Sequence, residues 1–293
     1  MLAVLALAAL ACNAPLEQPD TGATVQAIYL TITAQAGTAG VPTATASSSP
    51  SAETPTPTVG TPPPTLTPTP PQERSGNGAN LAIGRCTGAI AIDRNGSDWA
   101  AQIGTLRFTL DTATFGAANW SGTADASAEA RACWTAEALY LFLIVTDDVH
   151  VQTEQGATQW QGDEVELLFD GDLYGDFYQD RWDDDDVQLG LSAGNFGDLA
   201  PSAVRYHPVV ETLSSVSIGE WRMSEAGGNY VMEVAIPWVV LGVTPQVEAR
   251  YGFCLALSDN DRPDQAAQDS MVSHCSRLRV VDPTTWVTAW LAP

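Results

Sequence analysis

From about residue 80 to the C-terminus, short apolar runs alternate with glycine, asparagine and aspartate turn signals, and no long helical periodicity joins them. The runs are Ala89–Ile92, Leu106–Leu110, Ala138–Val145, Glu164–Phe169, Val187–Leu191, Tyr230–Ile236 and Tyr251–Leu257. Many short strands between turns are typical of two packed antiparallel sheets. The sequence therefore predicts an all-β domain over residues 81–293, an antiparallel β-sandwich of jelly-roll type.

The first twelve residues form an apolar run that ends in small residues and Cys12. A membrane-spanning helix needs about 20 apolar residues, so this run is typical of an export signal. Its end resembles a bacterial lipobox, with Cys12 as the lipidated residue, although an ordinary signal peptide with an incidental cysteine gives the same pattern. We expect an exported protein, either lipid-anchored on the outer face of the cytoplasmic membrane or extracellular.

Residues 13–80 are rich in alanine, threonine and proline. Proline removes backbone hydrogen-bond donors and favours polyproline II, so such a segment cannot bury a core. The sequence predicts a disordered linker that acts as a semi-rigid stalk.

The formal net charge is −23, and all twelve basic residues are arginines. Nucleic acids and anionic lipid surfaces are bound through arginine and lysine clusters, so this balance excludes both as partners. A membrane contact is expected only through an N-terminal lipid. The absence of lysine also excludes Schiff-base chemistry and a phosphate-binding loop lysine.

Four further cysteines lie in the predicted domain, and an even number in an exported chain indicates two disulfides. Three pairings are possible. One joins Cys254 to Cys275, which leaves Cys86 to Cys133. Because no Cys-x-x-Cys spacing is present, a zinc or redox site built from cysteines is not expected.

Several short motifs occur in the order found in one family, family 9 of the carbohydrate-binding modules, which this chain resembles over residues 85–291. They are Ile90-Ala-Ile-Asp93, Ser97-Asp-Trp99, Ala138-Leu-Tyr-Leu141, Val145-Thr-Asp-Asp148, Trp160-Gln-Gly-Asp-Glu-Val-Glu166, Glu233-Val-Ala-Ile-Pro-Trp238, Ser258-Asp-Asn-Asp261 and Asp282-Pro-Thr-Thr-Trp286. The resemblance implies a non-catalytic module for poly- or oligosaccharides, associated with carbohydrate catabolism. We expect most of the tryptophans to lie in the core.

In this family a sugar lies between two tryptophans, and the resemblance makes Trp160 one wall and Glu166 an acceptor for sugar hydroxyls. Trp160 stands among polar residues, where an aromatic plane can stack on a pyranose, or it closes the core at a strand end. The family's second tryptophan is missing, and we expect His274, which stands near its place, to stack on the sugar instead. An arginine is missing as well, near Gly190 or Leu191.

Eleven carboxylates lie between Asp163 and Asp186, with one arginine among them. Calcium takes six to eight oxygen ligands, and the resemblance implies structural calcium held partly by Asp147 and Asp148. Asp163 and Asp170 are further candidate ligands. The run of aspartates at 183–186 is better explained as a solvated loop than as a metal site.

Other classes of function remain open. A glycosidase would need a pair of carboxylic acids, and we expect Glu164 and Glu166 on opposite faces of their strand, which argues against that pair. A surface scaffold or adhesion domain that has lost sugar binding is the main alternative. A b-type haem domain of related fold, with methionine and histidine ligands, is a third.

Overall fold

The computed structural model describes residues 73–102, 106–223 and 228–293. Cys12, the predicted export signal and most of the predicted linker lie outside these residues. Residues 70–293 form one compact unit. Among the described residues, no helix is both long enough and apolar enough to cross a membrane.

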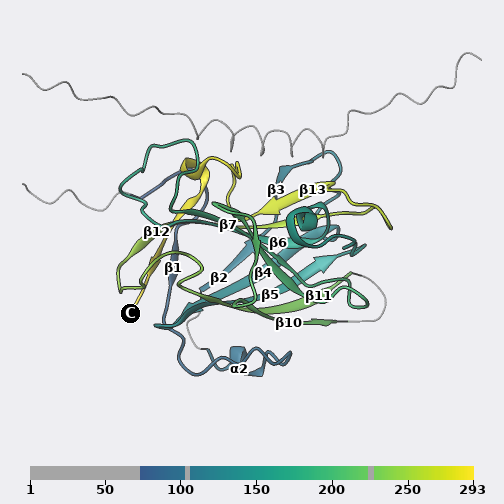
Figure 1. The fold of residues 1–293 in the computed structure, drawn as a ribbon, viewed down its shortest axis with the longest axis horizontal. Helices are drawn as coiled ribbons and strands as arrows, with labels where there is room; N and C mark the ends of the chain where they lie inside the picture. Colours follow the sequence, from purple (N-terminus) through teal and green to yellow (C-terminus); the bar gives the residue numbers. More distant parts are fainter. Residues whose placement is uncertain (1–72, 103–105, 224–227) are drawn as a thin grey trace, which may run out of the picture. The chain divides into compact units, whose positions relative to one another are not determined.

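The predicted β-sandwich is confirmed, and Figure 1 shows its two sheets as layers. One sheet has nine strands. Its main path is β1 (Leu81–Ile83), β14 (Val287–Leu291), β12 (Arg250–Asp259), β6 (Glu164–Asp170), β7 (Asp186–Ser192), β8 (Ser202–His207) and β9 (Glu211–Thr212). At its side, β13 (Ser270–Ser273) pairs with β12, and β3 (Thr112–Phe115) pairs with β13.

The second sheet has five strands in the order β10 (Ser217–Arg222), β11 (Tyr230–Pro237), β5 (Ala138–Asp147), β4 (Ala126–Trp134) and β2 (Leu106–Leu110). The near-continuous apolar run of β5 lies at its centre, where it is antiparallel to β11 and β4. Such a run is stable there because both of its faces are covered. The pair of β1 with β14 is parallel.

Large aromatic side chains fill the space between the sheets, as predicted. Trp134, Trp238 and Trp286 are at most 3% exposed. Trp99 belongs to a smaller cluster with Cys133, Phe142 and Val231. It lies on α2 (Ser97–Ala100), which Figure 1 shows outside the five-stranded sheet, next to β10.

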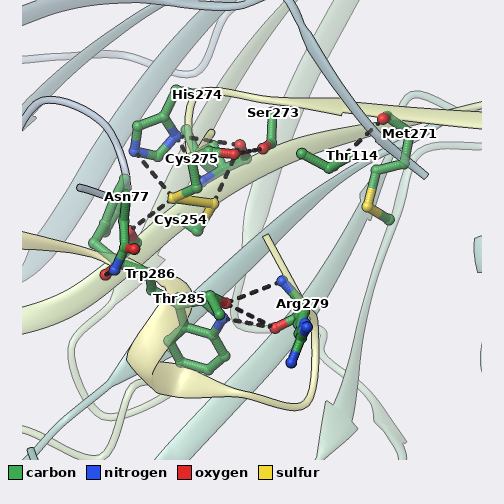
Figure 2. The surroundings of a disulfide bond; sticks show 12 residues. Asn77, Thr114, Cys254, Met271, Ser273, His274, Cys275, Arg279, Thr285 and Trp286 are labelled. Atoms are coloured by element: carbon green, nitrogen blue, oxygen red, sulfur yellow. Dashed lines mark hydrogen bonds between the residues drawn. A yellow bond between two sulfur atoms is a disulfide. The ribbon is translucent and has the colours of Figure 1, made fainter. Parts of the chain in front are cut away.

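The cysteines pair as Cys86–Cys133 and Cys254–Cys275. Figure 2 shows the second bond between β12 and the end of β13, beside His274 and Asn77. The Cys86–Cys133 bond joins segments 47 residues apart in the chain, and the Cys254–Cys275 bond joins segments 21 residues apart.

One predicted strand is wrong. Residues 89–92 form a loop rather than a strand. The Ala91 N–H donates to the Asp98 carboxylate at 2.7 Å, and the N–H groups of Asp93 and Arg94 donate to Glu233 at 3.2 and 3.1 Å. Carboxylates therefore satisfy this backbone in place of a neighbouring strand, and the loop buries Glu233 completely.

Residues 73–80, which the sequence assigns to the linker, pack against the sandwich. The Arg74 guanidinium lies 2.8 Å from the Asp170 carboxylate, and both side chains are buried. The Asn77 amide donates to the carbonyls of Thr284 and Trp286 at 2.7 and 3.0 Å. This segment is part of the folded domain.

Candidate functional site

Trp160 lies on the short 3-10 helix η1 (Gly156–Gln161), directly before β6. Its backbone is fixed by β12 and by the loop that follows β12. The Ser258 hydroxyl donates to the Trp160 carbonyl at 3.1 Å, and the Ala267 N–H donates to the Gln161 carbonyl at 2.8 Å. The indole is half-buried, so part of the ring remains accessible.

Glu164 and Glu166 follow Trp160 on β6, and the expectation that they lie on opposite faces is wrong. Alternate residues of a strand share a face, and these two are two positions apart. Both are almost fully buried, at 0% and 2% exposure. The charge of Glu166 raises the pKa of Glu164, which places the two carboxylates close together.

Polar side chains from three neighbouring segments hold these carboxylates. The Tyr206 hydroxyl and the Gln159 amide donate to Glu164, and the Gln188 amide donates to Glu166 at 2.7 Å. Burial raises the pKa of Glu164 well above its usual value and that of Glu166 to about 7. Glu166 is thus poised to carry or lose a proton near neutral pH.

Gly190 on β7 makes this packing possible. A Cβ atom at this position would lie 2.5 Å from Glu164 Oε2 and 2.7 Å from Tyr206 Cε2. This is the region where the family resemblance calls for an arginine. In this chain the space is taken by Glu164 and Tyr206, so a larger residue at 190 does not fit.

The network links Trp160 to the carboxylates. The Tyr206 hydroxyl, which bonds Glu164, also contacts the Trp160 backbone N–H. The side-chain amide oxygen of Gln188, Oε1, is buried and has no hydrogen-bond partner among the described residues. The arrangement joins a half-buried tryptophan to buried carboxylate and amide acceptors, a combination suited to a sugar with an apolar face and several hydroxyls.

The structure does not bring His274 to this place. Its ring packs on Phe108 and Phe253, with centroids 4.9 and 5.8 Å apart. Phe253 points to the core face of β12, whereas Ser258, five positions on, lies on the other face with Trp160. Burial lowers the pKa of His274 to about 4. His274 therefore does not form a second wall opposite Trp160.

Three of the four candidate calcium ligands lie in two separate groups of possible metal ligands, and Asp148 belongs to neither. Asp147 and Asp163 lie together with His150, and Asp170 lies with Asp176 and Asp186. Asp148 is exposed, and its charge helps to raise the pKa of Asp261. The structure thus separates residues that the sequence groups together.

Asp125, Asp259 and Asp261 form a group with oxygen ligands only, and their carboxylate oxygens lie within 4.8 Å of one another. Burial raises the pKa of both Asp259 and Asp261 to about 7, and neighbouring carboxylates add to the effect. One oxygen of each of these two residues is buried and lacks a hydrogen-bond partner among the described residues. Such orphaned acceptors fit a hard cation, because calcium prefers carboxylate oxygens.

The group around Asp170 is partly neutralised by Arg74. Burial raises the pKa of Asp170 to about 6 and that of Asp186 to about 8, and the Arg74 charge opposes the rise at Asp170. This ion pair already provides a countercharge for Asp170.

The sequence analysis missed several of these residues. Tyr206 carries no motif, and its role depends on the absence of a side chain at Gly190. Asp259 and Asp261 belong to the Ser258-Asp-Asn-Asp261 motif, which could have identified them as metal ligands. His150 follows Asp147 by three residues, but its second partner, Asp163, is thirteen residues away in the chain.

Comparison with known proteins identifies one family. Residues 107–292, more than half of the chain, match the family described as "Carbohydrate family 9 binding domain-like". Among curated proteins, the chain is 28% identical over 144 residues to endo-1,4-beta-xylanase A of Thermotoga neapolitana and 26% identical over 144 residues to that of Thermotoga maritima. Each match covers 48% of this chain and 12% of the xylanase, so the chain spans about an eighth of these relatives.

Solved structures show the same fold. One is a family 9 carbohydrate-binding module from Caldicellulosiruptor kristjanssonii in complex with cellotriose, with a TM-score of 0.50 and 15% identity. That match covers 73% of this chain and 94% of the module. A protein from Bacteroides uniformis, described as a candidate carbohydrate-binding protein, has a TM-score of 0.50 and 14% identity, with 73% and 99% coverage.

Proposed function

The chain belongs to the carbohydrate family 9 binding domain-like family, and on that premise we propose that it binds a poly- or oligosaccharide through the ring of Trp160. The observation that carries this proposal is the half-buried Trp160, whose backbone N–H contacts the Tyr206 hydroxyl that also bonds the buried Glu164 carboxylate. One face of a pyranose would stack on the indole, while its hydroxyls would meet acceptors such as Glu166 and Gln188. The family is one of binding domains, so no chemical step is assigned.

The test is calorimetric titration of the full chain with cello-, xylo- and chito-oligosaccharides, beside Trp160→Ala. An aromatic residue at the centre of a binding site contributes at least about 2 kcal/mol, so we expect binding to fall at least thirtyfold in this variant. Trp290→Ala is the matched control, because Trp290 is also half-buried but lies on β14 against Arg250. Equal loss in both variants, or none in Trp160→Ala, contradicts the proposal.

A second function, a surface scaffold or adhesion domain, is favoured by two observations. Glu166 is only 2% exposed, and His274 does not supply a second aromatic wall. A sugar would have to reach the acceptors past Tyr206. If calorimetric titration with a broad panel of glycans detects no binding heat, a scaffold or adhesion function is supported instead of sugar binding.

We further propose that the protein is exported and attached to lipid through Cys12. The apolar run before Cys12 and the two disulfides both support export, because disulfides persist in oxidising compartments. Mass spectrometry of the native N-terminus checks the anchor. A mature chain that starts elsewhere, without lipid, contradicts it.

Calcium is proposed as a structural ion held by Asp125, Asp259 and Asp261, with Asp148 nearby. Its contribution would be to neutralise carboxylates that repel one another. Asp125 directly precedes β4, Asp148 directly follows β5, and Asp259 ends β12. The ion would therefore join the two sheets where these strands begin or end.

A further inference from the structure

His150 lies just after β5 in a setting unlike that of an ordinary buried histidine. Its side chain is 1% exposed, and its ring is enclosed by Phe196 and Tyr230, each with a centroid 5.1 Å away. Nε2 lies 2.8 Å from the Gly194 carbonyl. A carbonyl only accepts, so Nε2 carries the hydrogen, and the hydrogen bond fixes the ring orientation.

The other ring nitrogen faces two carboxylates. Nδ1 lies 3.4 Å from Asp147 Oδ2 and 3.3 Å from Asp163 Oδ2. It is buried and has no hydrogen-bond partner among the described residues. The three atoms lie within 4.8 Å of one another.

These distances distinguish two explanations. If His150 were a protonated bridge between the aspartates, charge-assisted hydrogen bonds of about 2.7–2.9 Å would be expected. A tetrahedral ion with bonds of about 2.0–2.1 Å holds its ligand atoms roughly 3.3–3.4 Å apart. The two separations from Nδ1, 3.4 and 3.3 Å, match edges of such a tetrahedron and are longer than charge-assisted hydrogen bonds.

The surroundings orient the three ligands. The N–H groups of Val149 and Asn260 donate to Asp147 Oδ1 and Asp163 Oδ1, each at 2.8 Å, and the Val151 N–H donates to Asp163 Oδ2. The Oδ2 atom of each carboxylate is thereby turned toward His150. The Gly194 carbonyl is the kind of outer partner that holds a metal-binding histidine in place.

A second orphaned group lies at the same place. The Tyr230 hydroxyl is buried and has no hydrogen-bond partner among the described residues. The Tyr230 ring meets the His150 ring edge-on, with the two centroids 5.1 Å apart. The hydroxyl could bond a water molecule or another fourth ligand of the ion.

We propose that Asp147, His150 and Asp163 bind a borderline divalent cation, with zinc as the representative ion. Imidazole nitrogen suits zinc and its neighbours among the transition metals, whereas calcium takes six to eight oxygen ligands. Zinc, and not calcium, is therefore assigned to Asp147 and Asp163. Calcium stays assigned to Asp125, Asp259 and Asp261. The zinc site is independent of sugar binding.

The experiment uses the full chain, stripped with a chelator and dialysed, then titrated with zinc chloride and separately with calcium chloride. We expect one zinc ion per chain bound at this site. In His150→Gln, which can still donate to Gly194, zinc affinity should fall more than about tenfold, and calcium should still raise the melting temperature. Asp261→Asn is the matched control, which should weaken calcium and keep zinc.

Two results overturn the proposal: no zinc binding by the wild-type chain, or unchanged zinc affinity in His150→Gln. If that variant does not fold, nitrogen NMR of the wild-type imidazoles decides. Zinc should shift Nδ1 of His150 while Nε2 keeps its hydrogen. A Nδ1 signal that is unmoved by zinc, or protonated in its presence, rejects the site.

Discussion

The Tyr206 hydroxyl donates to the carboxylate of Glu164, with its oxygen 3.0 and 3.1 Å from the two carboxylate oxygens. Tyr206 comes from β8, and Glu164 begins β6, so the contact crosses β7 above Gly190. It closes the polar face of the nine-stranded sheet next to Trp160.

Tyr206→Phe should destabilise the domain, because Glu164 would keep only the Gln159 amide as a side-chain donor. Removing one partner of a buried hydrogen bond costs about 1–3 kcal/mol. Urea unfolding at neutral pH measures this change. Tyr174→Phe, at an exposed site, is the control and should be neutral. Equal stability of the two variants would show that Glu164 does not depend on the Tyr206 hydroxyl.

Gly190→Ala should also destabilise the domain, since the new methyl group meets Glu164 and Tyr206 well inside normal contact distance. Overpacking of this kind costs roughly 1–3 kcal/mol. Gly84→Ala is the matched control, because a Cβ atom there has nothing within 4 Å. Thermal unfolding of both variants is the measurement, and a Gly190→Ala protein as stable as Gly84→Ala contradicts the packing described.

The chelated protein should lose stability as pH rises. Burial raises the pKa of Asp259 and of Asp261 to about 7 in the folded state, against about 3.9 in the unfolded chain. A raised folded pKa gives stability that is fully present below the unfolded pKa and is lost as pH rises through the folded value. In chelator, the melting temperature should fall between about pH 4 and 7.

Calcium binds the deprotonated carboxylates, so the rise in melting temperature that it causes should be larger at pH 8 than at pH 5. Asp261→Asn should flatten the pH dependence in chelator and shrink the calcium effect. A melting temperature that chelation leaves unchanged at pH 8 would contradict the calcium proposal.

Arg74→Met should be strongly destabilising, because it leaves the buried Asp170 carboxylate without its guanidinium. Breaking a buried ion pair on one side costs about 3–5 kcal/mol. The matched control is Arg250→Met, whose partner Glu73 is 44% exposed, and an exposed pair contributes about 0–1 kcal/mol. Denaturant unfolding measures the free energy of unfolding of both variants. Similar losses would mean that the Arg74–Asp170 pair contributes no more than an exposed ion pair.

Much of the fold could be predicted because strand patterns depend on neighbours along the chain. Residues 106–110 form β2 as predicted, and residues 138–145 lie within β5. Residues 89–92 have the same apolar pattern, but their backbone bonds to the carboxylates of Asp98 and Glu233. Only the second of these partners is distant in the chain, and no local pattern reveals it.

The site was harder to predict because its contacts join distant strands. Trp160 and Glu166 share one motif, and the structure places both at one end of the nine-stranded sheet. His274 was misplaced because its position after β13 lies on the core face of the sheet. The Asp147 and Asp163 carboxylates belong to different sheets, at the end of β5 and just before β6, and both approach His150.

The Arg74–Asp170 pair has a mechanical consequence. Asp170 ends β6, and Trp160 stands just before its beginning. In the proposed lipid-anchored glycan binder, a glycan at Trp160 and a pull on the chain at residue 73 would load this strand at opposite ends, the second through Arg74. β6 is hydrogen-bonded along its length to β12 and β7. Tension between polysaccharide and cell would then run along the β6 backbone itself, rather than opening its two ladders one hydrogen bond at a time.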